Sequence, residues 1–366
     1  MIRLAIPSID QRDLDAVREA LESGYLVQGA RVRAFEEAVG AIVGVEHSVA
    51  VSSGTAALHL ALLALDVGPG DRVAVPAYSF IATANVVEVC GAMPIFVDIE
   101  PQTFGMDPAR LAEAIADKSP IKAVIPVHCF GQLADLDEIF VVAGDIPLVE
   151  DAAAAIGSTL GGKKAGAHGA MGCFSFHPRK AVTTGEGGVI TTNDAVLART
   201  LRALRNHGID PDAENTQFVA AGLNYRMTEF QAALGTTQLA KLDRIIAGRQ
   251  QAAARYDLLL DGTPVRRPVV RKQSTPVYQS YVVLLPEGVQ CDATIARMRE
   301  QGIETQIGNW HMPLTGYYRK RYGHKPGDFP VTDDVFARAL ALPLHADSCP
   351  TEQATVVRSL QEVIEE

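Results

Sequence analysis

The apolar positions in the first two thirds of the chain follow two alternating patterns. Leu14, Val17 and Leu21 recur at helical spacing and stop before Gly24, whereas residues 47–51 form a short continuous apolar run. The predicted helices are 10–22, 32–43, 55–65, 82–90, 111–116, 136–142 and 195–204, and the predicted strands are 47–51, 72–75, 93–97, 121–127, 148–149, 173–176 and 188–192. Strands that alternate with helices predict an α/β fold with a mostly parallel central sheet sandwiched by helices.

The pattern changes in the last third of the chain, after about Asp261. Prolines punctuate short strands there, at positions 264, 268, 276 and 286. The predicted elements are one or two long helices within 227–257, a strand at 281–285, and amphipathic helices at 292–301 and 351–365. We therefore expect a large domain at residues 1–245 and a smaller C-terminal α+β domain at residues 246–366, with the boundary inside the long helical stretch.

Composition narrows the class of protein. The chain has 48% hydrophobic and 21% charged residues, which is ordinary for a globular protein. Its formal charge of −10 argues against nucleic acid as the main partner, although a local cationic pocket for a phosphate ligand stays compatible with it. Five scattered cysteines without a C-x-x-C pair favour reduced thiols and predict neither a disulfide framework nor a metal site.

The apolar runs do not predict a membrane protein. The N-terminus reaches Asp10 before the apolar core of a signal peptide could form. No run of about 18 apolar residues, the length that spans a bilayer, occurs in the sequence. We expect a cytoplasmic protein with no membrane contact.

The most informative residue is Lys180. It lies in the run F-S-F-H-P-R-K, between the predicted strand 173–176 and the sequence T-T-G-E-G-G, which has three glycines in four positions. About thirty residues upstream, an apolar run ends in Glu150 and Asp151. Pyridoxal phosphate (PLP) requires a lysine for its Schiff base and an acid for its pyridine nitrogen. The alternative is a surface lysine in a glycine turn.

Two further segments suit the same cofactor. Ser53, Gly54 and Thr55 join a strand to a helix, and a helix N-terminus attracts a phosphate. The alternative is an ordinary N-cap, where serine and threonine are favoured for stability. Tyr78 and Phe80 follow another strand, at the edge where open α/β sheets bind ligands, and either ring could stack on a flat cofactor. The alternative for these two aromatic rings is packing in the protein core. The alternative role for Asp151 is that of a helix N-cap.

Taken together, these segments resemble the DegT/StrS family of nucleotide-sugar aminotransferases, which have the fold-type I PLP-transferase architecture. The resemblance runs from about Ile6 to the C-terminus. The segments that carry it are S-G-Y at 23–25, S-G-T-A-A-L-H at 53–59, E-D-A-A at 150–153, F-S-F-H-P-R-K at 174–180, T-T-G-E-G-G at 183–188, R-N-H-G at 205–208 and G-L-N-Y-R-M at 222–227.

The resemblance implies a role for individual residues. Lys180 corresponds to the lysine that bonds PLP, and Asp151 corresponds to the partner of the ring nitrogen. Phe80 matches the residue stacked on the ring. The phosphate would be held by Gly54 and Thr55 with the hydroxyl of Ser175, and by Asn224 of the neighbouring subunit. The resemblance therefore implies a homodimer with shared active sites.

The implied activity is transfer of an amino group, from L-glutamate, to a nucleotide-linked keto sugar. Three alternatives remain: the same chemistry on a non-nucleotide keto-cyclitol, a non-catalytic regulatory or binding protein, and a sugar dehydratase, which has histidine in place of Lys180. Two departures from the family pattern bear on the cofactor contacts and the substrate. Ala154 replaces a longer polar residue, and W-H-M-P-L-T at 310–315 replaces an H-Y-x-P-L-H-like segment.

Overall fold

A computed structural model describes residues 1–117 and 119–365. Its helices are α1 (Gln11–Glu22), α2 (Ala30–Val43), α3 (Gly54–Ala64), α4 (Ala82–Val89), α5 (Pro108–Ala116), α6 (Leu136–Ala143), α7 (Ala195–Arg205), α8 (Glu229–Leu239), α9 (Leu242–Leu259), α10 (Cys291–Glu300), α11 (Gly316–Tyr322), α12 (Pro330–Arg338) and α13 (Pro350–Glu365), with 3-10 turns η1 (Cys129–Gly131) and η2 (Met312–Leu314). The strands are β1 (His47–Val51), β2 (Arg72–Pro76), β3 (Tyr78–Ser79), β4 (Met93–Val97), β5 (Ala123–Val124), β6 (Val149–Asp151), β7 (Thr159–Leu160), β8 (Lys163–Lys164), β9 (Met171–Ser175), β10 (Gly188–Thr192), β11 (Ser274–Thr275), β12 (Tyr281–Leu284), β13 (Gln306–Ile307), β14 (Trp310–His311) and β15 (Ala339–Leu342).

The central sheet is mostly parallel, which confirms the predicted fold class. One part has the order β4-β2-β5 and another the order β1-β10-β9-β6. A parallel bridge between Val124 and Leu148 joins the two parts. Strands β4, β2 and β5 are parallel, as are β6 and β9, whereas β10 runs antiparallel to both β9 and β1. The strand predicted at residues 188–192 is therefore the antiparallel member of this part of the sheet.

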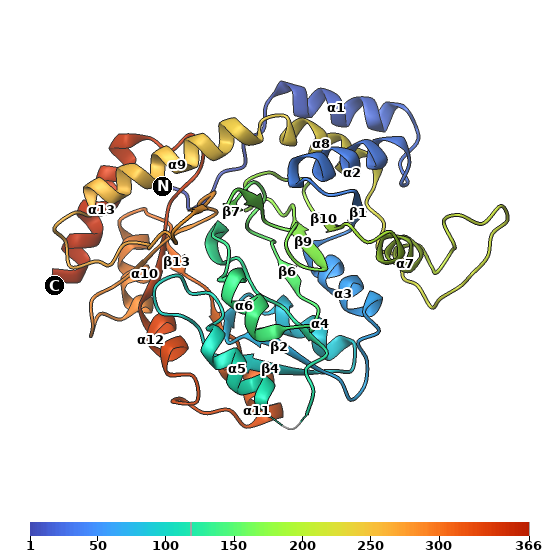
Figure 1. The fold of residues 1–366 in the computed structure, drawn as a ribbon. Coiled ribbons are helices and arrows are strands. Elements are labelled where there is room, and N and C mark those ends of the chain that lie inside the picture. Colours follow the sequence, from blue (N-terminus) through green and yellow to red (C-terminus); the bar gives the residue numbers. More distant parts are fainter. Residues whose placement is uncertain (118, 366) are drawn as a thin grey trace.

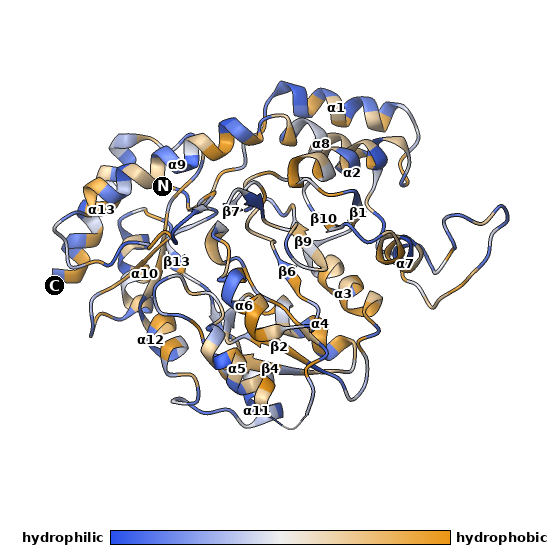
Figure 2. Cartoon of the chain, in the orientation of Figure 1, coloured by the Kyte–Doolittle hydropathy of each residue, from blue (hydrophilic) through white to orange (hydrophobic). Residues whose placement is uncertain are grey.

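Helices cover the central sheet on both faces, as expected for strands buried on both sides (Figure 1). Apolar residues gather along α3 and the central strands, and one buried cluster contains Leu60, Val75 and Ile190 (Figure 2). A second cluster packs Phe35 of α2 against Phe176 beyond β9, with ring centroids 5.2 Å apart. These two cores support the strand ends that carry the candidate residues.

The elements differ from the sequence prediction in length and in number, since no element was predicted for α11, α12 or β15. The strand expected at 121–127 is only two residues long, Ala123–Val124, and the helical stretch within 227–257 divides into α8 and α9. β6 ends at Asp151 itself, so the carboxylate belongs to the strand. No helix follows it, because the next residues form turns, and the helix N-cap alternative for Asp151 is wrong.

The C-terminal region forms its own small sheet, β12-β15-β13, with a separate apolar cluster that includes Tyr256, Tyr281 and Leu340. Ile2 bridges to Ile303, which ties the N-terminus to this region. Other parts of the C-terminal third pack on the large sheet instead, since β14 pairs with β3 and Tyr318 of α11 lies in the cluster around α3. A division near residue 245, inside α9, stays a proposal.

Candidate active site

The candidate residues surround one cavity of about 620 Å³. The residues to which the sequence assigned a role in cofactor binding and that line it are Gly54, Thr55, Phe80, Asp151, Ser175 and Lys180. They come from the ends of β1, β3, β6 and β9 and the segments that follow them. The sheet therefore brings together side chains that are more than a hundred residues apart in the chain.

The glycine-rich segment after Lys180 leads into β10 and completes the connection from β9. Thr183 Oγ1 donates a hydrogen bond to the carbonyl of Phe176 at 2.9 Å. A Cβ on Gly188 would lie 2.3 Å from the carbonyl oxygen of Ser53, so any other residue would push β10 away from the start of α3. The G-E-G-G sequence thus permits the close approach that places the lysine turn beside α3.

Lys180 lies in a turn in which its N–H donates to the carbonyl of His177 at 2.8 Å. Burial lowers the pKa of the Lys180 amine, and the nearby Asp151 carboxylate partly opposes that effect by stabilising the ammonium. A lowered pKa increases the fraction of neutral amine, which is the nucleophilic form. The surface-lysine alternative does not fit a half-buried lysine that lines a cavity.

Asp151 is held in place by neighbours on two sides. Thr83 Oγ1 donates to Asp151 Oδ2 at 2.8 Å, and the N–H of Ala153 donates to Oδ1 at 3.2 Å. Because the Thr83 proton is used in that bond, the hydroxyl of Ser79, 3.0 Å away, donates to Thr83 Oγ1. Asp151 is only 6% exposed, so the carboxylate is fixed in direction and shielded from water.

The adjacent acid, Glu150, does not line the cavity. Its carboxylate is buried and hydrogen-bonded to the surrounding protein. It accepts hydrogen bonds from His128 Nε2 at 2.8 Å and from the N–H groups of Gly166, His168 and Gly169. Burial raises the pKa of Glu150, but the hydrogen bonds from His128 and the backbone outweigh it and leave the pKa lowered. The two acids alternate along β6, so one supports the strand and the other faces the cavity.

The start of α3 forms another part of the cavity wall. Ser53 is the N-cap, and its Oγ accepts from the N–H of Ala56 at 3.1 Å. Gly54 and Thr55 are the first helical residues, whose N–H groups have no carbonyl partner within the helix. A Cβ on Gly54 would lie 2.7 Å from the Cβ of Ser175, so glycine allows Ser175 to approach the helix end. These donors and the helix dipole suit a phosphate.

The two aromatic candidates differ in position. Phe80 is 60% exposed and lines the cavity. Tyr78 is fully buried in the core against Phe104 and Phe130, with ring centroids 6.3 and 6.4 Å away, so the packed-core alternative holds for Tyr78. Of the two rings, Phe80 is the one available for stacking on a ligand.

Asn224 does not line the cavity. It is exposed and forms a bridge with Asn206 at the base of an arm, residues 206–226, which projects from the body beyond α7 (Figure 1). Phe218 and Val219 on this arm are 69% and 59% exposed. Within one subunit, therefore, Asn224 lies apart from the other candidate residues.

Residues from the C-terminal third, which sequence reasoning missed, complete the cavity. Gln306, Ile307, Gly308, Asn309, Trp310, Ala341 and Leu342 line it. Trp310 pairs with Ser79 across β14 and β3, and it is 43% exposed. The segment 310–315 was noted in the sequence only as a departure from a family pattern, and no motif pointed to Gln306 or Asn309.

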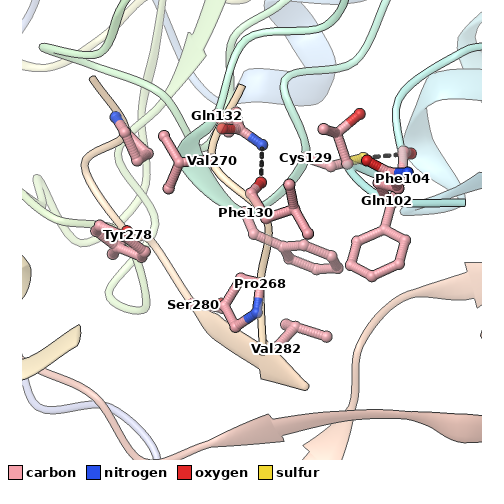
Figure 3. A pocket seen from close by; sticks show the side chains of 13 residues that line it. Gln102, Phe104, Cys129, Phe130, Gln132, Pro268, Val270, Tyr278, Ser280 and Val282 are labelled. Atoms are coloured by element: carbon pink, nitrogen blue, oxygen red, sulfur yellow. Dashed lines mark hydrogen bonds between the residues drawn. The ribbon is translucent and has the colours of Figure 1, made fainter. Parts of the chain in front are cut away.

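A smaller cavity of about 30 Å³ lies beside the large one and shares Cys129, Phe130 and Ser280 with it. Figure 3 shows its lining, which includes the rings of Phe104 and Phe130. Gln132 Nε2 donates a hydrogen bond to the carbonyl of Val269 at 2.9 Å. This volume has room for about one or two water molecules. It is too small for a cofactor.

Among residues 1–117 and 119–365, no group of three or more His, Cys, Asp or Glu side chains could hold a metal ion. Within the same residues, no helix has the length and apolar character needed to cross a membrane.

Comparison with known proteins identifies the family. The model of the DegT/DnrJ/EryC1/StrS aminotransferase family matches residues 7–361. The chain belongs to this family. A relative, the GDP-perosamine synthase of Caulobacter vibrioides, is 38% identical over 99% of this chain and 98% of the relative.

Solved structures agree with the family assignment. The Streptococcus pneumoniae protein Spr1654, assigned as a sugar aminotransferase and solved in its PMP form, has a TM-score of 0.93 and 29% identity over 100% of this chain and 98% of that one. Its PLP form gives the same TM-score at 28% identity, again over 100% and 98%. Helicobacter pylori PseC, an aminotransferase in pseudoaminic acid biosynthesis, has a TM-score of 0.93 and 27% identity over 100% of this chain and 99% of that one.

The protein is a PLP-dependent sugar aminotransferase of the DegT/DnrJ/EryC1/StrS family. The non-catalytic alternative is thereby excluded. The cavity fits PLP, because it combines a half-buried amine, a fixed carboxylate, an exposed aromatic face and a helix N-terminus. Ala154 also lines the cavity, and its methyl group offers the cofactor no hydrogen bond.

Proposed function

We propose that the protein transfers an amino group from L-glutamate to a nucleotide-linked keto sugar. The observation that carries the proposal is the placement of Lys180 and Asp151 on one cavity of about 620 Å³, large enough for more than the cofactor. The similarity to a GDP-perosamine synthase, named for a GDP-linked compound, supports a nucleotide-linked substrate.

Each cofactor-binding residue then has a role. Gly54, Thr55 and Ser175 would hold the phosphate of PLP, and Phe80 would pack on its ring. Asp151, held by Thr83, would keep the pyridine nitrogen protonated, because an adjacent opposite charge favours the ionised form. When bound, PLP acts as an electron sink for the carbon that gains or loses the amine.

Lys180 would both bond the cofactor and move the proton. Its lowered pKa increases the fraction of neutral amine that can accept a proton at Nζ, and its protonated form can return that proton in the opposite half of the reaction. The neighbouring Asp151 limits the fall in pKa, so the amine can still become protonated.

We also propose that the active enzyme is a homodimer with shared sites. The support is the position of Asn224, which is exposed at the base of the projecting arm and away from the cavity of its own subunit. In a two-fold dimer each subunit presents the same surface to the other, so both cavities could receive the partner's asparagine.

The experiment that tests the function is a substrate screen. Purified enzyme with PLP is mixed with L-glutamate and each member of a panel of GDP-, UDP- and TDP-linked keto sugars, with Lys180→Ala as the control. The expected result is formation of 2-oxoglutarate and of an amino sugar nucleotide with the corresponding mass. Amination of a keto-inositol, with no turnover of any nucleotide-linked sugar, would contradict the proposal.

A further inference from the structure

Arg179 occupies a fixed position next to the candidate lysine. Its N–H donates to His177 Nδ1 at 3.2 Å, and its carbonyl accepts a hydrogen bond from Gln279 Nε2. The side chain is exposed and lines the cavity, and Nη1 donates to Gln306 Oε1 at 3.0 Å. The guanidinium therefore lies between the lysine turn and β13.

The charges around the cavity leave this cation without a carboxylate partner. Arg179 and Lys180 are the Arg and Lys residues in the cavity lining, and Asp151 and Glu186 are its acids. Asp151 interacts with Lys180, and Glu186 is 4.0 Å from His177. Within residues 1–117 and 119–365, no carboxylate forms an ion pair with Arg179. A positive charge is thus open to the cavity in a chain of net charge −10.

We propose that Arg179 binds the anionic oxygens of the substrates, a carboxylate of the amino donor or a phosphate of the sugar nucleotide. The inference rests on the proposed function, which commits Lys180 to the cofactor and leaves Arg179 as the cation that faces the substrate. The guanidinium has five N–H groups, and one bond to Gln306 leaves a pair for bidentate binding of either oxygen group. Both substrates use the same cavity in turn, so one arginine can serve both.

The bond between Arg179 and Gln306 suggests a different role, because it could merely connect the lysine turn to β13. The two roles are separable. Loss of Gln306 removes the connection but leaves the positive charge in the cavity, whereas loss of Arg179 removes both.

The test measures ligand binding by fluorescence of Trp310, the single tryptophan of the chain, which lines the same cavity. The PLP-loaded wild type and the variants Arg179→Gln, Arg179→Lys and Gln306→Ala are titrated with glutarate, a dicarboxylate without an amine, and separately with GDP and UDP. Arg358→Gln, an exposed change on α13 outside the cavity lining, is the charge-matched control. PLP content is measured for each protein.

Arg179→Gln should weaken binding of at least one ligand class by about 10- to 100-fold, the loss expected for a hydrogen-bonded charge. Arg179→Lys should restore part of it. Gln306→Ala, which keeps the positive charge in the cavity, should lose clearly less than Arg179→Gln, and Arg358→Gln should stay within about 2-fold of wild type. Loss for glutarate alone identifies the donor carboxylate, loss for the nucleotides alone identifies the phosphate, and loss for both identifies a shared site.

Three results would overturn the inference: unchanged binding of all ligands by Arg179→Gln, an equal loss in Gln306→Ala, or loss of PLP from Arg179→Gln in place of loss of ligand. Wild-type enzyme that binds none of the ligands would also overturn it. The titrations measure binding and need no turnover, so they can be interpreted even if the substrate screen fails. A failure of the proposed role of Arg179 is therefore distinguishable from a failure of the proposed function.

Discussion

Two walls of the large cavity are built in different ways. The first, with Gly54, Asp151 and Lys180, comes from the ends of strands β1, β6 and β9 of the central sheet, and close packing and hydrogen bonds fix it. The second, with Gln306 and Trp310, comes from short strands of the C-terminal third, and Trp310 is 43% exposed. The difference suggests that the first wall fixes the common chemistry of the family and that the second adapts to the particular sugar.

The largest effect should come from the first wall. Lys180→Ala should lower kcat by about 10⁴-fold or more, because it removes both the nucleophile and the proton carrier. Steady-state kinetics and borohydride reduction followed by peptide mass analysis measure the two losses. Lys163→Ala, an exposed lysine on β8, is the matched control. A PLP link that survives in Lys180→Ala would place the cofactor on another residue.

A smaller loss is expected for Asp151→Asn, about 10²-fold in kcat, since the pyridine nitrogen loses the charge that keeps it protonated. The same change should lower the pKa of Lys180 further, because Asp151 raises that pKa in the native protein. The pH at which apoenzyme begins to take up PLP should then move to lower values. Asp145→Asn, on the surface, is the control. Near-normal kcat would mean that another acid serves the cofactor.

Mixing two inactive variants tests whether the first wall needs Asn224 from the partner subunit. Lys180→Ala and Asn224→Ala subunits, each inactive alone, should form heterodimers with one intact and one doubly damaged site. Random mixing should restore about a quarter of wild-type activity. Verified heterodimers without activity, or an active enzyme that sediments as a monomer, would show that Asn224 does not act across an interface.

The smallest effect should come from the second wall. Trp310→Ala should raise the KM for the sugar by about 3- to 10-fold through loss of an aromatic contact, with kcat changed by less than about 2-fold. Trp310→Phe should retain most of the affinity. A loss of kcat as large as that of Asp151→Asn would show that the two walls do not divide chemistry from recognition.

The sequence by itself determined the fold class and the composition of the first wall. Alternating strand and helix patterns predicted the mostly parallel sheet. Gly54, Asp151 and Lys180 each lie in a short segment at the end of a predicted strand or just after it. Local signals of this kind are readable because strand ends and helix starts have strong residue preferences. The roles of these residues remain predictions.

Only the tertiary structure decided which neighbours complete the site. The contact of Thr83 with Asp151 spans 68 residues and that of Arg179 with Gln306 spans 127, and neither leaves a periodic or local trace in the sequence. Tyr78 and Phe80 look equivalent as residue types, yet the packing of β3 buries one and exposes the other to the cavity. The physical reason is that long-range contacts depend on how the strands and helices pack, whereas local sequence preferences fix only where each element begins and ends.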